Sequence, residues 1–410
     1  MGKIFMYISQ WHLKVGSPGL SLFTFDTETA EMEKVRQISN DLSFGFSLVD
    51  QDRGLIYLCN ECDVYPEVPF NSGRVYCYRI DPVSGGLTLV NRKETCCSFT
   101  SYLNLDPEKK HLIVSNHSMP NFSTRLTRDE NGNIQPVLQH QDALMNLFAL
   151  NEDGSIGEML DFHNHGGIQT TLHGGLTIAH PHSAIRSPSG KIFACCDKGD
   201  GHMYLYSIEG DRLKLLSRTL TDVPGSEPRH CAFHPTMPYL FINHEHTPGD
   251  RLTVTTFRYG EDGSMEKVAT FHGDVDGFEP KEAPRQQQGM AISPDGKTVY
   301  TQAHGHNLLL AMTVDEETGE LRQIQATPID GVWPRSLSFS PDGRFLICCA
   351  LAGQISVYRR NPDGTLTDTG HRAFAKGAGC ASFYRPSTPS KRGTITPPSG
   401  CASASSKPWA

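Results

Sequence analysis

Short apolar runs separated by tight turns recur from one end of the chain to the other. The runs MAI, before Ser293, and KTVYTQ, after Gly296, show the arrangement, because two apolar segments flank one four-residue turn. Such a pair of segments around a short turn is typical of a β-hairpin. No helical periodicity of useful length competes with this pattern, so the sequence predicts an all-β protein.

Two classes of turn alternate along the chain. The first reads Ser-Pro-Asp-Gly in its clearest copies, where Pro presets φ and Gly relieves crowding, as in a type I turn. Its copies and variants lie at residues 50–53, 106–109, 187–190, 234–237, 293–296 and 340–343. The second class follows each hairpin, at residues 26–29, 81–85, 151–154, 209–211, 261–263, 316–319 and 361–364.

Seven turns of the second class against six of the first indicate a ring of seven four-stranded blades. The missing turn is explained if residues 380–384 supply the innermost strand of blade 1, beside residues 3–8, since such closure removes two exposed sheet edges. We therefore predict a seven-bladed β-propeller over residues 1–386 and a disordered, Ser/Pro/Thr/Lys-rich tail over residues 387–410. A pair of β-sandwiches would also contain many short strands, but it does not explain why the same two turns recur throughout.

Composition narrows the range of partners. A net charge of −8 gives no support for nucleic-acid binding, which needs a basic surface. The chain contains no apolar run of about 18 residues, so we expect no membrane span. Its 12 cysteines are too few for a disulfide framework and are predicted to be free packing thiols. The N-terminal segment lacks the features of a signal peptide, and we expect a cytoplasmic protein.

The predicted topology gathers polar residues at one face of the disc. Within a blade, the first turn lies on one face, so the start of the first strand and the end of the second meet on the opposite face. Counting outward from the turns brings to that face His180, His182 and Asp197 of blade 4, Arg229, His244 and Glu245 of blade 5, Arg285 and His304 of blade 6, and Arg335 of blade 7. There they would line one mouth of the central channel, which is a common location for ligand sites.

Three of these residues, Arg229, Arg285 and Arg335, are arginines that each follow a proline. Three guanidinium groups aimed at one cavity suit a carboxylate or a phosphate, which they can bind bidentately. A buried Arg–Glu pair between neighbouring strand ends can also be purely structural, and for any single arginine the two interpretations have about equal weight. The repetition at equivalent positions favours a binding site.

The segments HPHSAIRSPSGKIFACCDKGD, GSEPRHCAFHPTMPYLFINHEH, QGMAISPDGKTVY and PRSLSFSPDGRFLI resemble the lactonase family of seven-bladed β-propellers. That family contains bacterial 6-phosphogluconolactonase and fungal 3-carboxy-cis,cis-muconate lactonizing enzyme, and the resemblance covers residues 3–385. It implies a cofactor-free enzyme whose active-site set falls here on His182, Arg229, Glu245 and Arg285. The remaining mouth residues are predicted to bind the substrate: His180, Asp197, His244, His304 and Arg335.

The working hypothesis is hydrolysis of a small anionic, sugar-type lactone. His182 would act as general base on a water molecule, and Arg229 and Arg285 would hold the anionic group and stabilise the oxyanion. Glu245 would orient Arg229 or His182, or pass a proton to the leaving alkoxide. The sequence also departs from a standard phosphogluconolactonase, because blade 3 carries an insertion over roughly residues 118–146 and residues 163–182 are rich in His and Gly.

Three alternatives remain open. The same groups suit lactonisation of a muconate-like dicarboxylate, in which the base becomes a proton donor. A metal-dependent lactonase would use some of the loop histidines, but we expect no metal site because no fixed ligand spacing is visible. Those histidines are His163, His165, His173, His180, His182, His244, His246, His304 and His306. A non-enzymatic propeller that binds a protein at the same mouth is the last alternative. The oligomeric state does not follow from the sequence.

Overall fold

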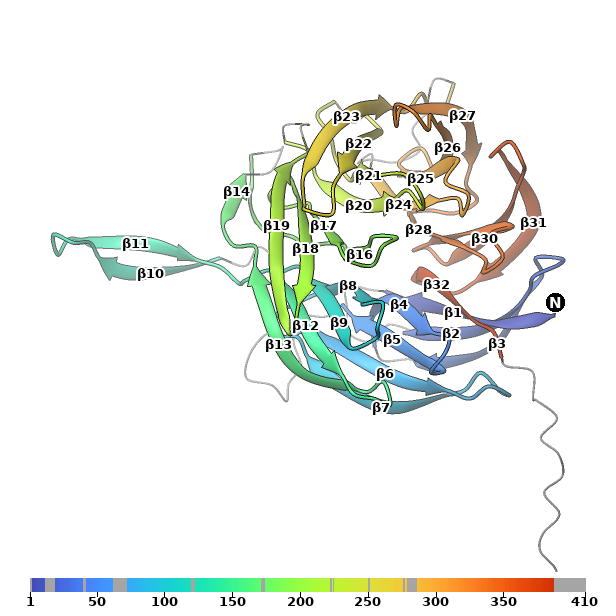
Figure 1. Ribbon diagram of the computed structural model, residues 1–410, viewed down its shortest axis with the longest axis horizontal. Helices are drawn as coiled ribbons and strands as arrows, with labels where there is room; N and C mark the ends of the chain where they lie inside the picture. Colours follow the sequence, from blue (N-terminus) through green and yellow to red (C-terminus); the bar gives the residue numbers. More distant parts are fainter. Residues whose placement is uncertain are drawn as a thin grey trace, which may run out of the picture.

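The computed structural model describes residues 2–11, 19–39, 42–61, 72–118, 122–170, 174–221, 223, 225–249, 251–275, 277–278 and 286–386. Over these residues the chain forms seven four-stranded antiparallel sheets arranged around a central axis (Figure 1). The predicted seven-bladed β-propeller is confirmed. The described residues form no helix that could cross a membrane.

Each blade is one sheet, and the blades are numbered in chain order. Blade 1 consists of β1 (Lys3–Gln10), β2 (Leu20–Asp26), β3 (Met32–Ser39) and β32 (Ala378–Tyr384). Blade 2 consists of β4 (Phe44–Asp50), β5 (Leu55–Asn60), β6 (Arg74–Ile80) and β7 (Leu87–Glu94). Blade 3 consists of β8 (Thr100–Leu105), β9 (His111–Asn116), β12 (Leu144–Leu150) and β13 (Ile156–Asn164).

Each of the remaining four blades consists of four consecutive strands, the first of which lies next to the channel. Blade 4 consists of β16 (Ile185–Arg186), β17 (Phe193–Asp197), β18 (His202–Glu209) and β19 (Arg212–Leu220). Blade 5 consists of β20 (Pro228–Phe233), β21 (Tyr239–His244), β22 (Thr253–Tyr259) and β23 (Met265–His272). Blade 6 consists of β24 (Gln286–Ile292), β25 (Thr298–His304), β26 (Leu308–Val314) and β27 (Leu321–Pro328). Blade 7 consists of β28 (Pro334–Phe339), β29 (Phe345–Ala350), β30 (Gln354–Arg360) and β31 (Leu366–Phe374).

Two further hairpins stand outside the blades. One is formed by β10 (Ser123–Arg128) and β11 (Ile134–Gln139), inside the predicted insertion of blade 3. The other is formed by β14 (Ile168–Thr170) and β15 (Leu176–Ile178), between blades 3 and 4. Figure 1 shows β10 and β11 projecting from the disc as an arm.

The ring closes where the sequence predicted. Strand β32 pairs with β1, with Phe5 opposite Tyr384 and Tyr7 opposite Ser382, so both ends of the propeller share blade 1. The Ser-Pro-Asp-Gly turns also form as predicted, since the amide of Gly296 donates to the carbonyl of Ser293 at 2.8 Å. The tail predicted over residues 387–410 lies outside the described residues.

The core lies between the faces of neighbouring blades. Tyr57 of blade 2 and Leu103 and Phe148 of blade 3 are buried in one such interface. All residues of β5 and β29 are buried, because each strand is covered on both faces. Their sequences, LIYLCN and FLICCA, are therefore apolar almost throughout instead of alternating. The described cysteines are all free, as predicted, and only Cys96 among them is exposed.

Candidate active site

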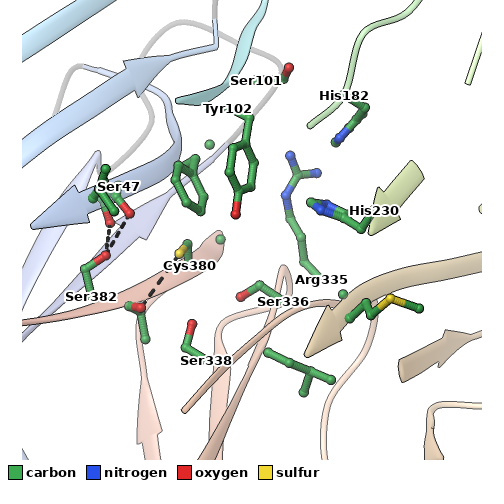
Figure 2. A pocket seen from close by; sticks show the side chains of 18 of the residues that line it. Ser47, Ser101, Tyr102, His182, His230, Arg335, Ser336, Ser338, Cys380 and Ser382 are labelled. Atoms are coloured by element: carbon green, nitrogen blue, oxygen red, sulfur yellow. Dashed lines mark hydrogen bonds between the residues drawn. The ribbon is translucent and has the colours of Figure 1, made fainter. Parts of the chain in front are cut away.

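A cavity of about 270 Å³ lies in the central channel, and all seven blades contribute to its wall. Six blades supply residues of their innermost strand, and blade 4 supplies His182, which precedes β16. Figure 2 shows the imidazoles of His182 and His230 on one side of the pocket and the hydroxyls of Ser47 and Ser382 on the opposite side. The cavity therefore has an imidazole wall that faces a hydroxyl-bearing wall.

The two arginines of this cavity occupy β-bulges. The ladder of β20 with β21 shifts between Pro228 and His230, and the ladder of β28 with β29 shifts between Pro334 and Ser336. The residue left out of each ladder is an arginine, and both arginines line the cavity. A bulge re-aims the side chain of its extra residue, which explains how strand residues can point into the channel.

Arg229 belongs to a buried ion-pair chain. Its Nε atom lies 2.7 Å from Oε2 of Glu245, while Oε1 of Glu245 accepts a hydrogen bond of 2.9 Å from Nζ of Lys198. Burial alone would raise the pKa of Glu245, but Lys198 and Arg229 outweigh it and lower the pKa to about 2. Burial lowers the pKa of Arg229 to about 10, so both partners remain charged at neutral pH.

Arg335 is held by a second carboxylate. Its Nη2 atom lies 3.0 Å from Oε2 of Glu61, and its guanidinium carbon lies 4.2 Å from the centre of the Trp11 ring. Oε1 of Glu61 lies 3.2 Å from Nε2 of His117. Burial would raise the pKa of Glu61, but Arg335 and His117 together lower it. Glu61 therefore joins an arginine of blade 7 to a histidine of blade 3.

Four imidazoles crowd the site. The rings of His117 and His180 stack with centroids 3.9 Å apart, and the ring of His182 lies 5.5 Å from His117 and 5.3 Å from His230. Burial lowers the pKa of His182 well below its ordinary value, and Arg229 and His230 lower it further. His182 is therefore neutral at neutral pH and can accept a proton. Its Nδ1 atom is buried and has no hydrogen-bond partner within the described part of the protein.

The structure brings together part of the predicted set. His182, Arg229 and Arg335 line the channel cavity, and Glu245 holds Arg229. His180 lies beside them through its stack on His117, and its side chain also borders a neighbouring cavity of about 450 Å³. Arg285 lies outside the described residues.

Three predicted substrate-binding residues lie apart from the channel cavity. The carboxylate of Asp197 is fully buried and accepts hydrogen bonds from the backbone amides of His180 and Gly199, so it shapes the loop instead of facing the channel. Nε2 of His244 lies 2.9 Å from Oγ1 of Thr255, inside blade 5. The ring of His304 stacks on Trp333, 4.8 Å between centroids. Counting residues outward from a turn predicts on which face of the disc a side chain lies, but it does not predict how far that side chain lies from the central axis.

Counting missed three residues that complete the site: Glu61, His117 and Lys198. Each follows the second strand of its blade, in the segments CNECD, SNHS and CCDKGD. The ends of these strands gather at the mouth of the channel, but nothing in the three segments indicates which side chain turns inward. His230, the neighbour of Arg229, was also missed and lines the cavity.

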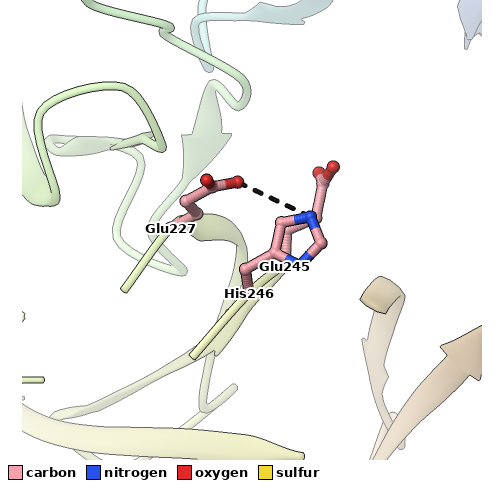
Figure 3. A group of neighbouring side chains, drawn as sticks. All are labelled: Glu227, Glu245 and His246. Carbon is pink, nitrogen blue, oxygen red and sulfur yellow. Dashed lines mark ion pairs between the residues drawn. The ribbon is translucent and has the colours of Figure 1, made fainter. Parts of the chain in front are cut away.

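Of the loop histidines that the structure describes, His246 belongs to a group with the spacing of metal ligands. Among the described residues, one group has suitable spacing, namely Glu227, Glu245 and His246, whose ligand atoms lie within 4.8 Å of one another (Figure 3). Both oxygens of Glu245 already face cations, Lys198 and Arg229. A metal ion would have to compete with these ion pairs, so the residues present do not favour one.

Arginines and imidazoles thus converge on one concave cavity of the propeller, and small molecules commonly bind in cavities with convergent polar groups. The sequence also matches a known protein family. Residues 6–383 match the family described as "Lactonase, 7-bladed beta-propeller", and the chain belongs to this family. The predicted resemblance is thereby confirmed.

Individual relatives are distant but cover almost the whole chain. The protein is 22% identical to the 6-phosphogluconolactonase of Formosa agariphila over 87% of this chain and 92% of the relative. It is 23% identical to the 6-phosphogluconolactonase of Bacillus subtilis over 90% of this chain and 94% of the relative. Among solved structures, the periplasmic gluconolactonase PpgL of Pseudomonas aeruginosa is 20% identical, with a TM-score of 0.77 over 94% of this chain and 100% of that one. At 20% identity, the similarity to the PpgL structure shows only that the two chains share a fold.

Proposed function

We propose that the protein hydrolyses a small anionic, sugar-type lactone at the channel cavity. One observation carries the proposal. Nδ1 of His182 and Nη1 of Arg229 are buried, have no hydrogen-bond partner in the described part of the protein, and belong to side chains that line the same cavity. Leaving such an atom unsatisfied costs about 1–3 kcal/mol, so both point to a ligand that supplies the missing partner.

The protonation states support base catalysis by His182. A neutral imidazole takes a proton from water as the water oxygen attacks the lactone carbonyl. The guanidinium of Arg229 stabilises the oxyanion of the tetrahedral intermediate. When the ring C–O bond breaks, the imidazolium returns the proton to the leaving alkoxide. The product is the open-chain hydroxy acid.

Glu245 serves this reaction as a positioning residue. Because its pKa is lowered to about 2, it is ionised at neutral pH and has no proton to give to the alkoxide. It fixes Arg229 through the contact at 2.7 Å and is itself fixed by Lys198. The proton of the leaving group therefore comes from His182.

The remaining lining supports an anionic polyol as substrate. Arg335 presents a second guanidinium for a carboxylate or phosphate. The rest of the wall includes the hydroxyl groups of Ser47, Ser336, Ser338 and Ser382, which can hydrogen-bond sugar hydroxyls. The activity printed for the Formosa and Bacillus relatives, 6-phosphogluconolactonase, is in keeping with such a substrate.

The test is acid release from 6-phosphogluconolactone and from glucono- and galactonolactones, corrected for spontaneous hydrolysis. His182→Ala should lower kcat/KM by about 10²-fold or more, the usual scale for a general base. His371→Ala, at a histidine of the outer strand β31, is the matched control and should leave the rate unchanged. Unchanged turnover in His182→Ala would remove this mechanism. The same assay with and without EDTA tests the metal-dependent alternative.

A further inference from the structure

Tyr102 presents to the channel cavity a polar group that the proposed reaction does not use. It lies in β8, the innermost strand of blade 3, directly after the ladder irregularity at Ser101, and it lines the cavity. Figure 2 shows its side chain between the imidazole wall and the hydroxyl-bearing wall. Within the ranges that the structure describes, no group of the protein forms a hydrogen bond with its hydroxyl. The hydroxyl is therefore available to a ligand in the cavity.

Other tyrosines of the propeller use their hydroxyl to join neighbouring blades. Four of them donate to a backbone carbonyl in a turn of the second class, in the following blade, at 2.7 to 2.9 Å: Tyr7, Tyr57, Tyr239 and Tyr300. Tyr102 lies in an innermost strand and has no such acceptor. A contact between blades therefore does not explain its hydroxyl.

The ring of Tyr102 is held from two sides. It stacks on Phe46 of blade 2, with 3.8 Å between the ring centroids and an interplanar angle of 23°. It also meets the ring of His230 of blade 5 edge to face, at 5.9 Å between centroids. These contacts restrict the rotation of the side chain, so the hydroxyl is in place before a ligand binds and little entropy is lost on binding.

The chemistry of this hydroxyl suits an uncharged partner. Burial raises the pKa of Tyr102 well above its ordinary value, so the phenol is neutral at neutral pH. A neutral phenol both donates and accepts a hydrogen bond, as the hydroxyl group of a sugar does. A carboxylate or phosphate is better matched by the guanidinium of Arg335. The Tyr102 hydroxyl therefore fits a hydroxyl group of the substrate and not its anionic group.

Two of the serines in the cavity wall are already bonded to each other. Oγ of Ser47 lies 2.7 Å from Oγ of Ser382, which also lies 2.8 Å from the backbone carbonyl oxygen of Ser47. A ligand has to compete with this pair of serines, whereas the Tyr102 hydroxyl has no protein partner to give up. Of these three hydroxyls, that of Tyr102 is the best placed to select a substrate.

We propose that Tyr102 is a specificity-determining residue, which hydrogen-bonds a ring hydroxyl of the lactone and thereby selects polyhydroxylated lactones over lactones without ring hydroxyls. This inference rests on the proposed lactonase function and deepens it. A site that hydrogen-bonds a substrate hydroxyl disfavours an analogue that lacks it, because the polar group of the protein is then left unpaired. His182 and Arg229 act on the lactone carbonyl, so Tyr102 affects the choice of substrate and not the reaction steps.

The first experiment compares the hydrolysis of glucono-δ-lactone with that of δ-valerolactone, which has the same six-membered ring without hydroxyl groups. Tyr102→Phe removes only the hydroxyl and keeps the stacked ring. It should lower kcat/KM for glucono-δ-lactone by about 5- to 10-fold, the scale of one hydrogen bond between uncharged groups, mainly through KM. The rate on δ-valerolactone should not change. Tyr259→Phe makes the same change in β22, outside the cavity lining, and should leave both rates unchanged. Equal losses on the two lactones, or no loss on either, would overturn the proposal.

The second experiment measures binding without turnover. Calorimetry gives the affinities for D-gluconate and for 5-hydroxypentanoate, the ring-opened acids of the two lactones, which carry the same charge. The wild type should bind gluconate more tightly, and Tyr102→Phe should weaken gluconate binding by the same 5- to 10-fold without affecting 5-hydroxypentanoate. A wild type that binds gluconate through Tyr102 but hydrolyses no lactone removes the proposed function and keeps the recognition of hydroxyls by Tyr102. A wild type that binds gluconate no better than 5-hydroxypentanoate contradicts that recognition, whatever it hydrolyses.

Discussion

The innermost strands of blades 5 and 7 differ from those of blades 2 and 3 at one equivalent position. All four strands have a ladder irregularity near their start, at Arg229, Arg335, Gly45 and Ser101 respectively. All four residues line the channel cavity. The backbone thus repeats, while the residue at the bulge decides whether a blade contributes a guanidinium or leaves space.

In blade 2 the residue at the bulge, Gly45, leaves room for the side chain of Glu61. A Cβ atom at Gly45 would collide with Oε2 of Glu61, the same oxygen that lies 3.0 Å from Arg335. The absent side chain of one blade therefore makes room for the carboxylate that holds the arginine of another. The seven blades repeat the same backbone arrangement, but different residues at the bulge positions make the site asymmetric.

The largest expected effect comes from removing the guanidinium of blade 5. Arg229→Gln should lower kcat/KM by about 10²–10³-fold, the cost of losing an oxyanion donor. Ser101→Ala changes the equivalent position of blade 3 and should have little effect, because Ser101 offers no charge. Initial rates on the best lactone measure both. Equal losses in the two variants would mean that the position matters and the guanidinium does not.

A smaller effect is expected when the space in blade 2 is filled. Gly45→Ala should displace Glu61 and loosen Arg335, since the new methyl group collides with the carboxylate. We expect a loss of about tenfold in kcat/KM, below the 10²-fold that displaced catalytic groups can cost. The change should appear mainly in KM, because Arg335 is proposed to bind the substrate anion. A lowered melting temperature with unchanged kinetics would show that Glu61 has only a structural role.

The smallest effect is a shift in the pH profile. His182 acts when neutral, and burial, Arg229 and Lys198 all lower its pKa, so kcat/KM should stay constant as pH falls through 6.5 and decline only at lower pH. Lys198→Met removes one of these cations and raises the pKa of His182, so the acid limb should move to higher pH. Lys191→Met, at an exposed turn, is the control. An acid limb that stays in place would contradict the role of His182.

The sequence predicted the fold because its information is local and repeated. Turn residues such as Pro294 and Gly296 constrain the backbone wherever they occur, and their count gave both the number of blades and the closing strand. It also predicted the face of the disc on which His182, Arg229 and Arg335 lie, since strand ends alternate between faces.

Only the tertiary structure decided which of those residues reach the channel. Counting from a turn assumes an unbroken ladder, but the bulges add one residue and turn Arg229 and Arg335 inward. The same counting could not separate Glu245, which holds Arg229, from its neighbour His244, which bonds to Thr255 within the blade. Glu61, His117 and Lys198 come from three different blades, and their contacts depend on how neighbouring blades pack. The number of residues between two such side chains does not predict whether they touch, because the contacts form only when the blades pack into the closed ring.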